Sequence, residues 1–180
     1  MNITDKARTF SVAAHAAVGQ RRKYTGEPYS VHPVEVAGIV STVTGSESII
    51  AAALLHDVLE DTQVTHDLLV AEFGAYIADL VLQVTDVSRP EDGNRAVRKA
   101  KDCEHIAQAS PAGQTIKLAD LISNTTSIVA RDPEFARVYL LEKQAMLDVL
   151  TAGHRCLQLR ARTLLIESAE RIGLNLRQGS

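Results

Sequence analysis

The sequence predicts an all-α protein of about eight to ten helices. Apolar residues recur every three or four positions along most of its 180 residues, which is the period of an amphipathic helix. Recognisable helix starts separate these segments. The clearest is Asp132-Pro133-Glu134, which offers a cap, a proline for the first helical position and an acid for the first turn. No run of alternating β-branched residues indicates a strand.

The first half of the chain predicts five helices and one polar loop. Thr4 and Thr65 are the expected caps of the first and fourth helices, Pro33 suits the first position of the second, and Gly74 ends the fourth. The loop over 20–30 contains Gly and Pro and lies before the second helix. The five helices are expected at about 4–17, 33–44, 47–61, 65–73 and 75–85.

The second half begins with the most loop-like stretch, 86–94, and predicts four more helices. Ser110-Pro111 separates a basic helix from a largely apolar one. These helices are expected at about 95–109, at 114–130, at 133–150 and in a last amphipathic segment that ends near Gly173. At this length, one domain over 1–180 is the simplest organisation, with a C-terminal helix within 151–180.

Composition narrows the class of function. Hydrophobic residues make up 46% and charged residues 23% of the chain, values of an ordinary globular protein. The net charge of −3 argues against a dedicated nucleic-acid binder. No apolar run reaches the roughly 18 residues of a membrane span, and the N-terminus lacks a signal-peptide pattern. Cys103 and Cys156 are few and far apart, so we expect a reducing, cytoplasmic location. The sequence predicts no oligomeric state.

The pair His56-Asp57 is the strongest functional signal. It ends an apolar run that reads as a buried helix, and burying such groups without partners costs several kcal/mol. On a continuous helix, His56 would neighbour Glu60, and Asp57 would neighbour Asp61, each four residues apart. One short segment thus offers an imidazole and three carboxylates, which indicates a metal site with its own acid and base.

A second pair, His66-Asp67, is an internal control. It follows Thr65 and precedes an apolar run, so Asp67 falls in a first helical turn, where a carboxylate is favoured by exposed N–H groups. We interpret this pair as capping chemistry. A His-Asp dipeptide alone therefore does not indicate a metal site, and the surrounding sequence distinguishes the two pairs.

Two distant residues complete a candidate ligand set. Asp120 lies inside an apolar helix with Asn124 one turn later, although an exposed ion pair with Lys117 is an equal alternative for it. His32 lies between a loop and a helix start, where a purely structural histidine is equally plausible. With His56-Asp57, these two residues would make two nitrogen and two oxygen ligands. That set suits one borderline divalent ion such as Mn, Fe, Co or Zn.

Two basic clusters could meet phosphate. Arg21-Arg22-Lys23 precedes His32, and such cations near a metal are what a polyphosphate substrate requires, although a solvated loop is the alternative. For the cluster within 95–101 we favour an exposed helix face.

In order along the chain, these motifs resemble the HD-domain hydrolase module of the RelA/SpoT family. The resemblance covers about residues 5–150 and rests on four blocks. These are 15–33 with its Arg-Arg-Lys and Gly-Glu-Pro-Tyr segments, Ala53-Leu54-Leu55-His56-Asp57 with Glu60-Asp61-Thr62, Phe73-Gly74 with Val84-Thr85-Asp86, and Lys117-Leu118-Ala119-Asp120 with Asn124. The chain looks like a small stand-alone alarmone hydrolase of the Mesh1-like kind.

The resemblance implies an activity and a role for each candidate residue. It implies a Mn²⁺-dependent enzyme that removes the 3′-diphosphate of ppGpp and pppGpp. The implied metal ligands are His32, His56, Asp57 and Asp120, the implied water-activating pair is Glu60 and Asp61, and the implied nucleotide contacts are Arg22, Lys23 and Asn124. It assigns no role to Arg137 or Tyr139.

Two other functions fit the same residues. One is an HD-type hydrolase of another nucleotide, such as an NADPH phosphatase, since metal ligands recognise phosphate and water rather than a base. The other is a catalytically silent alarmone-binding protein, against which the intact Glu60 and Asp61 weigh.

Overall fold

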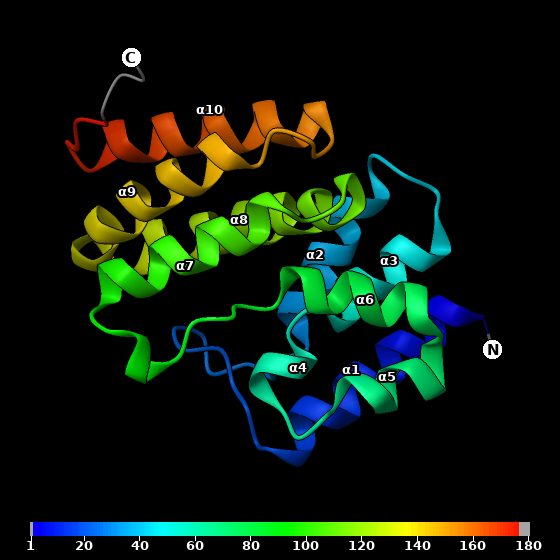
Figure 1. Ribbon diagram of the computed structural model, residues 1–180. Coiled ribbons are helices and arrows are strands. Elements are labelled where there is room, and N and C mark those ends of the chain that lie inside the picture. The colour runs from blue at the N-terminus through cyan, green and yellow to red at the C-terminus, as the bar shows by residue number, and fades with distance from the viewer. Residues whose placement is uncertain (1, 177–180) are drawn as a thin grey trace.

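A computed structural model describes residues 2–176 and confirms the all-α prediction (Figure 1). The helices are α1 (Ile3–Ala17), α2 (Val31–Ser41), α3 (Glu47–Leu55), α4 (Val58–Asp61), α5 (His66–Phe73), α6 (Ala75–Val84), α7 (Arg95–Ala107), α8 (Pro111–Arg131), α9 (Pro133–Val149) and α10 (Arg155–Arg171), with a 3-10 turn, η1 (Pro90–Asp92), before α7. Within these residues the only strand-like pairing is an isolated bridge between Arg21 and Pro28. Residues 177–180 of the expected C-terminal segment lie outside the described part.

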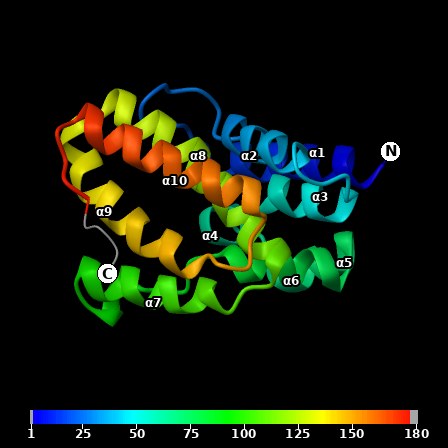
Figure 2. The same ribbon diagram turned by 90° about the horizontal axis from the view of Figure 1, so that it is seen from above.

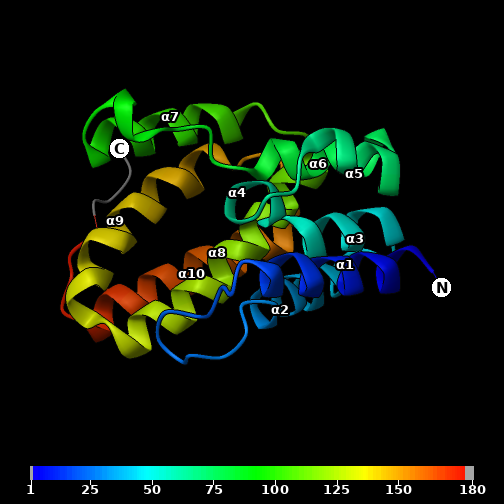
Figure 3. The same ribbon diagram turned by 90° about the horizontal axis from the view of Figure 1, so that it is seen from below.

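Helix α8 is the structural centre. Its residues from 113 to 123 are all buried, and it packs against α2, α6, α9 and α10. Figures 2 and 3 show α1, α2, α3, α5 and α6 gathered on one side and α7 and α9 on the other, with α10 running alongside α8. Every helix within 2–176 is too short or too polar to cross a bilayer.

Several helix starts differ from the sequence predictions. Asn2, not Thr4, caps α1, because its Oδ1 accepts a hydrogen bond from the backbone N of Asp5 at 2.8 Å. Helix α2 begins at Val31, so Pro33 is its third residue; the first-turn N–H groups have no partner within the helix, and a proline there costs little. Helix α8 begins at Pro111 rather than 114, because the Ser110 hydroxyl accepts from the N–H of Gly113.

The predicted helix over 47–61 is wrong in one important respect. It ends at Leu55, where His56 is the C-terminal cap, and a separate turn, α4, begins at Val58. The Nδ1 of His56 donates to the carbonyl of Ala53 at 2.8 Å and so satisfies an oxygen near the helix end. This interruption places His56 and Asp57 at a junction between helices.

Candidate metal centre

Three parts of the fold bring the four candidate ligands together. His32 lies in the first turn of α2, His56 and Asp57 lie at the junction of α3 and α4, and Asp120 lies in the middle of α8. Because α2 and α3 both pack against α8, residues far apart in the sequence become neighbours. His32 is the second residue of α2, which agrees with its predicted position between a loop and a helix start.

The ligand atoms converge on one point. The Nε2 of His32 lies 3.1 Å from Oδ1 of Asp120 and 3.6 Å from Oδ2 of Asp57. The Nε2 of His56 lies 3.1 Å from Oδ2 of Asp57 and 3.8 Å from Oδ1 of Asp120. His32, His56 and Asp57 each offer an atom within 4.8 Å of the others. The structure therefore contains a candidate metal-binding group.

Outer contacts orient both imidazoles toward that point. The Nδ1 of His32 is 3.1 Å from the hydroxyl of Ser123, which itself donates to Glu35 at 2.9 Å, so Nδ1 carries the proton. The Nδ1 of His56 donates to a backbone carbonyl. In both rings Nε2 is thus the nitrogen left free for a metal, in the way that hydrogen bonds fix histidine ligands.

The cluster fits a cation. The Nε2 of His56 is buried with no hydrogen-bond partner, although Asp57 lies beside it, and an unpaired buried nitrogen of this kind needs a partner. Two nitrogen and two carboxylate donors without a thiolate suit a borderline divalent ion. On these grounds the residues present fit one divalent metal.

Electrostatics favour positive charge at the same place. Burial would lower the pKa of His56, but the carboxylates of Asp57 and Asp120 outweigh it and raise the pKa to about 9. Burial would raise the pKa of Asp120, but Lys117 and the two histidines hold it well below its usual range. Either a proton on His56 or a cation between the groups satisfies these two carboxylates.

Tyr29 and Asn124 donate hydrogen bonds to the two candidate ligand carboxylates. The hydroxyl of Tyr29 donates to Oδ2 of Asp57 at 2.7 Å, and the amide of Asn124 donates to Oδ1 of Asp120 at 2.6 Å. Asn124 therefore contacts a candidate ligand in this structure. The sequence reasoning gave no role to Tyr29, and only its place in the Gly-Glu-Pro-Tyr segment could have drawn attention to it.

Glu60 and Asp61 lie beside the cluster on α4. Burial and the neighbouring carboxylate of Asp86 raise the pKa of Glu60 to about 7, although the residue itself reaches the surface. Burial also raises the pKa of Asp61, while a hydrogen bond from Gln20 opposes the shift. The sequence suggested that Glu60 and His56 lie on one continuous helix. They do not, because α3 ends at Leu55 and α4 begins at Val58.

Lys117 ties Asp120 to a second group of charges. Its Nζ is 3.5 Å from Asp120 and 3.5 Å from Asp86. The ion pair proposed as the alternative role of Asp120 is thus present, but it is buried rather than on a solvated edge. Asp86 also accepts from Lys99 at 2.8 Å. The sequence analysis named Lys117 as a possible partner of Asp120, but it did not predict that Asp86 would join Lys117 and Lys99.

The basic cluster within 95–101 is largely paired with acids. Arg95 makes a two-pronged contact with Glu142 at 2.6 and 2.8 Å, and Lys101 binds Asp92 at 2.7 Å. Both basic residues are exposed. The exposed-face interpretation describes these two, whereas Lys99 reaches inward.

The two basic residues expected to contact nucleotide have other neighbours in the described part of the chain. Lys23 is 3.4 Å from Asp132 and lies over the ring of Tyr24. Arg22 lines a groove of about 630 Å³ that α2 and α8 also border, and that groove reaches Ser123. Ser123 contacts Nδ1 of His32 at 3.1 Å, so the groove reaches the side of that ring opposite Nε2.

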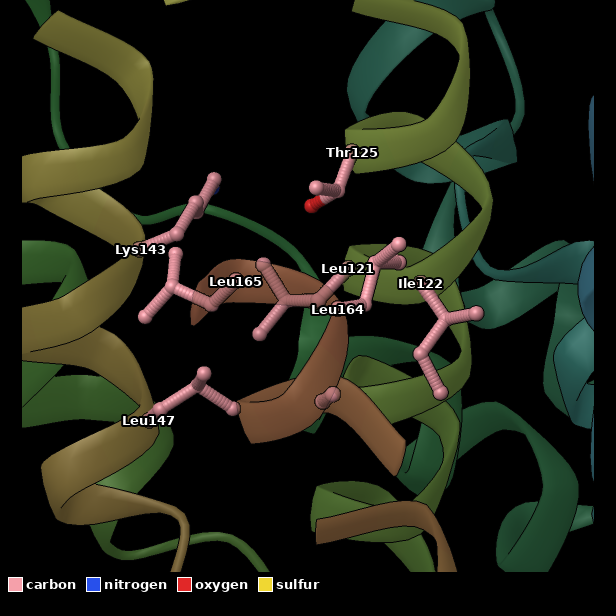
Figure 4. A pocket seen from close by; sticks show the side chains of 8 residues that line it. Leu121, Ile122, Thr125, Lys143, Leu147, Leu164 and Leu165 are labelled. Atoms are coloured by element: carbon pink, nitrogen blue, oxygen red, sulfur yellow. The ribbon is translucent and has the colours of Figure 1, made fainter. Parts of the chain in front are cut away.

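Helices α8, α9 and α10 meet in an apolar seam, which Figure 4 shows from close by. Leu121, Leu147 and Leu164 gather there, and the seam leaves no space for a water molecule. Lys143 lies at its edge, with Nζ 5.1 Å from the centre of the Tyr139 ring. Burial and the charge of Lys117 lower the pKa of Lys143. This seam positions α8 and offers no second site.

Comparison with protein families identifies an HD domain over residues 7–145, close to the 5–150 expected from the sequence. A curated relative from Homo sapiens, the guanosine-3′,5′-bis(diphosphate) 3′-pyrophosphohydrolase MESH1, is 36% identical over 132 residues, which cover 72% of this chain and 71% of that protein. Its counterpart from Danio rerio is 39% identical and covers 70% of each chain.

Longer relatives match the same region. A probable guanosine-3′,5′-bis(diphosphate) 3′-pyrophosphohydrolase from Synechocystis is 36% identical over 73% of this chain, but the match spans only 17% of that protein. Among solved structures, a metazoan ortholog of SpoT that hydrolyses ppGpp matches with a TM-score of 0.82 and 28% identity, over 97% of this chain and 98% of the other. The similarity thus extends from sequence to nearly the whole described fold.

Proposed function

The chain belongs to the HD-domain family, and on that basis we propose that it hydrolyses the 3′-diphosphate of ppGpp and pppGpp. The observation that carries the proposal is the convergence of His32, His56, Asp57 and Asp120 on one point, in a fold that matches a ppGpp-hydrolysing protein over nearly its whole length. The MESH1 relatives are named guanosine-3′,5′-bis(diphosphate) 3′-pyrophosphohydrolases, which is the activity proposed for this chain.

The four convergent residues would hold one divalent ion, and we propose Mn²⁺. Mixed nitrogen and oxygen donors without sulfur are compatible with this ion and with other borderline metals. When bound, the ion would lower the pKa of water and neutralise charge on the phosphate. Tyr29 and Asn124 would keep the two carboxylates in place, through the hydrogen bonds that they donate to them.

Glu60 and Asp61 would act as the acid and base. The reaction adds water to a phosphorus of the 3′-diphosphate and breaks its bond to the ribose 3′ oxygen, which takes up a proton as pyrophosphate leaves. A pKa near 7 suits Glu60 to accept the proton of the water and return it to the leaving oxygen. Asp61, held by Gln20, would orient the attacking water.

We propose that Arg22, Lys23 and Asn124 contact the nucleotide. The guanidinium of Arg22 makes no hydrogen bond or ion pair within residues 2–176, so it is available for phosphate or a base. Lys23 is exposed and its contact with Asp132 is long, so an anionic ligand could replace that partner at little cost. We also propose a cytoplasmic location, which two free cysteines favour.

The test is a nucleotide panel with purified protein. Wild type is incubated with ppGpp, pppGpp and NADPH in the presence and absence of Mn²⁺, beside Glu60→Gln. We expect pyrophosphate release from ppGpp that needs Mn²⁺ and that Glu60→Gln lowers at least about 100-fold.

The other outcomes separate the rivals. Phosphate release from NADPH without turnover of ppGpp would contradict the proposed substrate and favour another nucleotide hydrolase. Tight ppGpp binding without turnover in any metal would identify a silent binding protein.

A further inference from the structure

We propose that Gln20 and His15 are positioning residues, which fix the orientation of the Asp61 carboxylate. This inference rests on the proposed function, since Asp61 is its proposed water-orienting group. Neither residue belongs to the candidate ligand set. The carrying observation is a chain of two short hydrogen bonds that ends on Asp61.

The chain of contacts links three elements. The Nε2 of Gln20 donates to Oδ2 of Asp61 at 2.8 Å, and Oε1 of Gln20 lies 2.6 Å from Nδ1 of His15. His15 is 1% exposed, in the last turn of α1, while Gln20 begins the loop after it. Asp61 ends α4, forty-one residues further along. A contact over such a sequence distance is not a by-product of local geometry.

The hydrogen bonds from His15 through Gln20 to Asp61 have one set of donor and acceptor roles. An ionised carboxylate has no proton to donate, so Gln20 must turn its NH₂ toward Asp61 and its carbonyl oxygen toward His15. Nδ1 of His15 must then carry a proton, which in a neutral ring leaves Nε2 bare. Nε2 of His15 is in fact buried without a hydrogen-bond partner. A buried Nε2 without a partner costs stability. We infer that the position of the His15 ring is set by the contact of Nδ1 with Gln20.

The surroundings hold His15 and Gln20 rigidly. The ring of Tyr29 packs against His15 with centroids 4.9 Å apart. The backbone N–H of Gln20 donates to the carbonyl of His15, and the N–H of Tyr29 donates to the carbonyl of Gln20. Because Tyr29 also holds Asp57, one small scaffold orients a ligand carboxylate and the Asp61 carboxylate together. Such support is what keeps reacting groups within tenths of an ångström of their working positions.

The first experiment replaces Gln20 by glutamate, which has the same shape but no NH₂ to donate. We expect kcat for ppGpp to fall about 10- to 100-fold, as for a misplaced catalytic group. We also expect KM and the affinity for Mn²⁺, measured by calorimetric titration, to stay within about threefold. Gln83→Glu is the matched control, because Gln83 uses only its Oε1, as an acceptor from Ser110. Its kcat should equal that of wild type.

The second experiment tests His15 through a conservative rescue. His15→Phe keeps a ring but removes the donor, so Gln20 can flip and kcat should fall about tenfold. His15→Asn places an N–H near the position of Nδ1 and should recover most of that loss. Adding His15→Phe to Gln20→Glu should cost nothing further, because the two residues act on Asp61 in series. Equal losses in the Phe and Asn variants would overturn the proposal in favour of a packing role.

A third measurement does not depend on activity. Nitrogen-15 NMR of the wild-type protein should show His15 protonated at Nδ1 and bare at Nε2. The opposite tautomer would overturn the inference even in an active enzyme. If wild type turns over no nucleotide, the proposed function fails, whereas the tautomer and the Gln20→Glu response of the His15 resonance still decide whether the chain of contacts exists.

Discussion

The two His-Asp pairs of this chain have the same letters and opposite surroundings. His56-Asp57 lies at a junction between helices, where the histidine is 2% exposed. His66-Asp67 lies in the first turn of α5, behind the Thr65 cap. There Nε2 of His66 contacts Oδ1 of Asp79 at 3.0 Å, both side chains are partly exposed, and Asp67 is exposed.

The difference shows that direction and burial, rather than residue type, make a candidate metal site. In the first pair both side chains turn inward and meet two further candidate ligands, His32 from α2 and Asp120 from α8. In the second pair Asp67 lies in the first turn of its own helix, and His66 makes a single surface contact with Asp79. Such exposed contacts contribute little to stability. A cation can be held by four convergent donors and not by one exposed pair.

The largest predicted effect separates the pairs by activity. His56→Ala removes one of four convergent ligands, so we expect turnover of ppGpp to fall at least about 1,000-fold together with the loss of metal binding. His66→Ala should leave kcat/KM within about twofold, since its contact with Asp79 is partly exposed. Steady-state kinetics at saturating Mn²⁺ measures both.

A melting experiment is the companion of that prediction. Mn²⁺ should raise the melting temperature of wild type and of His66→Ala, because a ligand that binds only the folded state stabilises it. His56→Ala should show no such rise. A full Mn²⁺ response in His56→Ala would contradict the assignment of His56 as a ligand.

The second prediction concerns pH dependence beside His56-Asp57. The pKa of Glu60 is raised to about 7, so the carboxyl is protonated below that pH and can accept no proton. We expect kcat/KM to rise with pH through a limb at or below about 7, since a bound cation would lower this pKa. Glu60→Gln should remove the limb and most of the activity.

Glu72→Gln is the control for that pH profile. Glu72 is exposed on α5, where it contacts Lys6 at 2.9 Å, far from any candidate ligand. Its profile should superimpose on that of wild type. An unchanged limb in residual Glu60→Gln activity would assign the titration to another group, and Glu60 would lose its proposed role as base.

The fold was predictable from the sequence because its helices carry strong local signals. Asp132 caps α9 through a hydrogen bond from Phe135 N, and Thr65 caps α5, both as expected. Gly74 ends α5 with a backbone φ of 81°, a conformation that glycine adopts without strain. The sequence analysis missed the break after Leu55. The hydrogen bond from His56 to the carbonyl of Ala53 depends on the direction of the His56 side chain, and hydrophobic periodicity does not reveal that direction.

The site was predictable only in part. Burial inside apolar segments pointed to His56, Asp57 and Asp120, and the structure brings these together with His32. The supporting residues could not be found in this way. Tyr29, Gln20 and Ser123 act through partners 28 to 91 residues away, and no local pattern encodes such contacts.

The smallest predicted effect tests the second pair as capping chemistry. Thr65 accepts a hydrogen bond from the backbone N of Leu68 at 3.3 Å, so Thr65→Ala should lower the free energy of unfolding by about 1 kcal/mol. Thr9→Ala is the matched control, since Thr9 is exposed in the interior of α1 and only donates to the carbonyl of Asp5. Alanine favours a helix there, so stability should be equal or slightly higher. Urea denaturation of both variants measures the difference.

Activity completes this last comparison. Both threonine variants should turn over ppGpp like wild type at 25 °C, because α5 contributes no candidate ligand. A loss of activity in Thr65→Ala without a loss of stability would mean that the segment around His66-Asp67 reaches the reaction after all. The two pairs would then differ in degree, and burial alone would no longer separate a ligand pair from a cap. A pure stability loss instead assigns the Thr65 side chain to helix formation alone, as the capping interpretation of this segment requires.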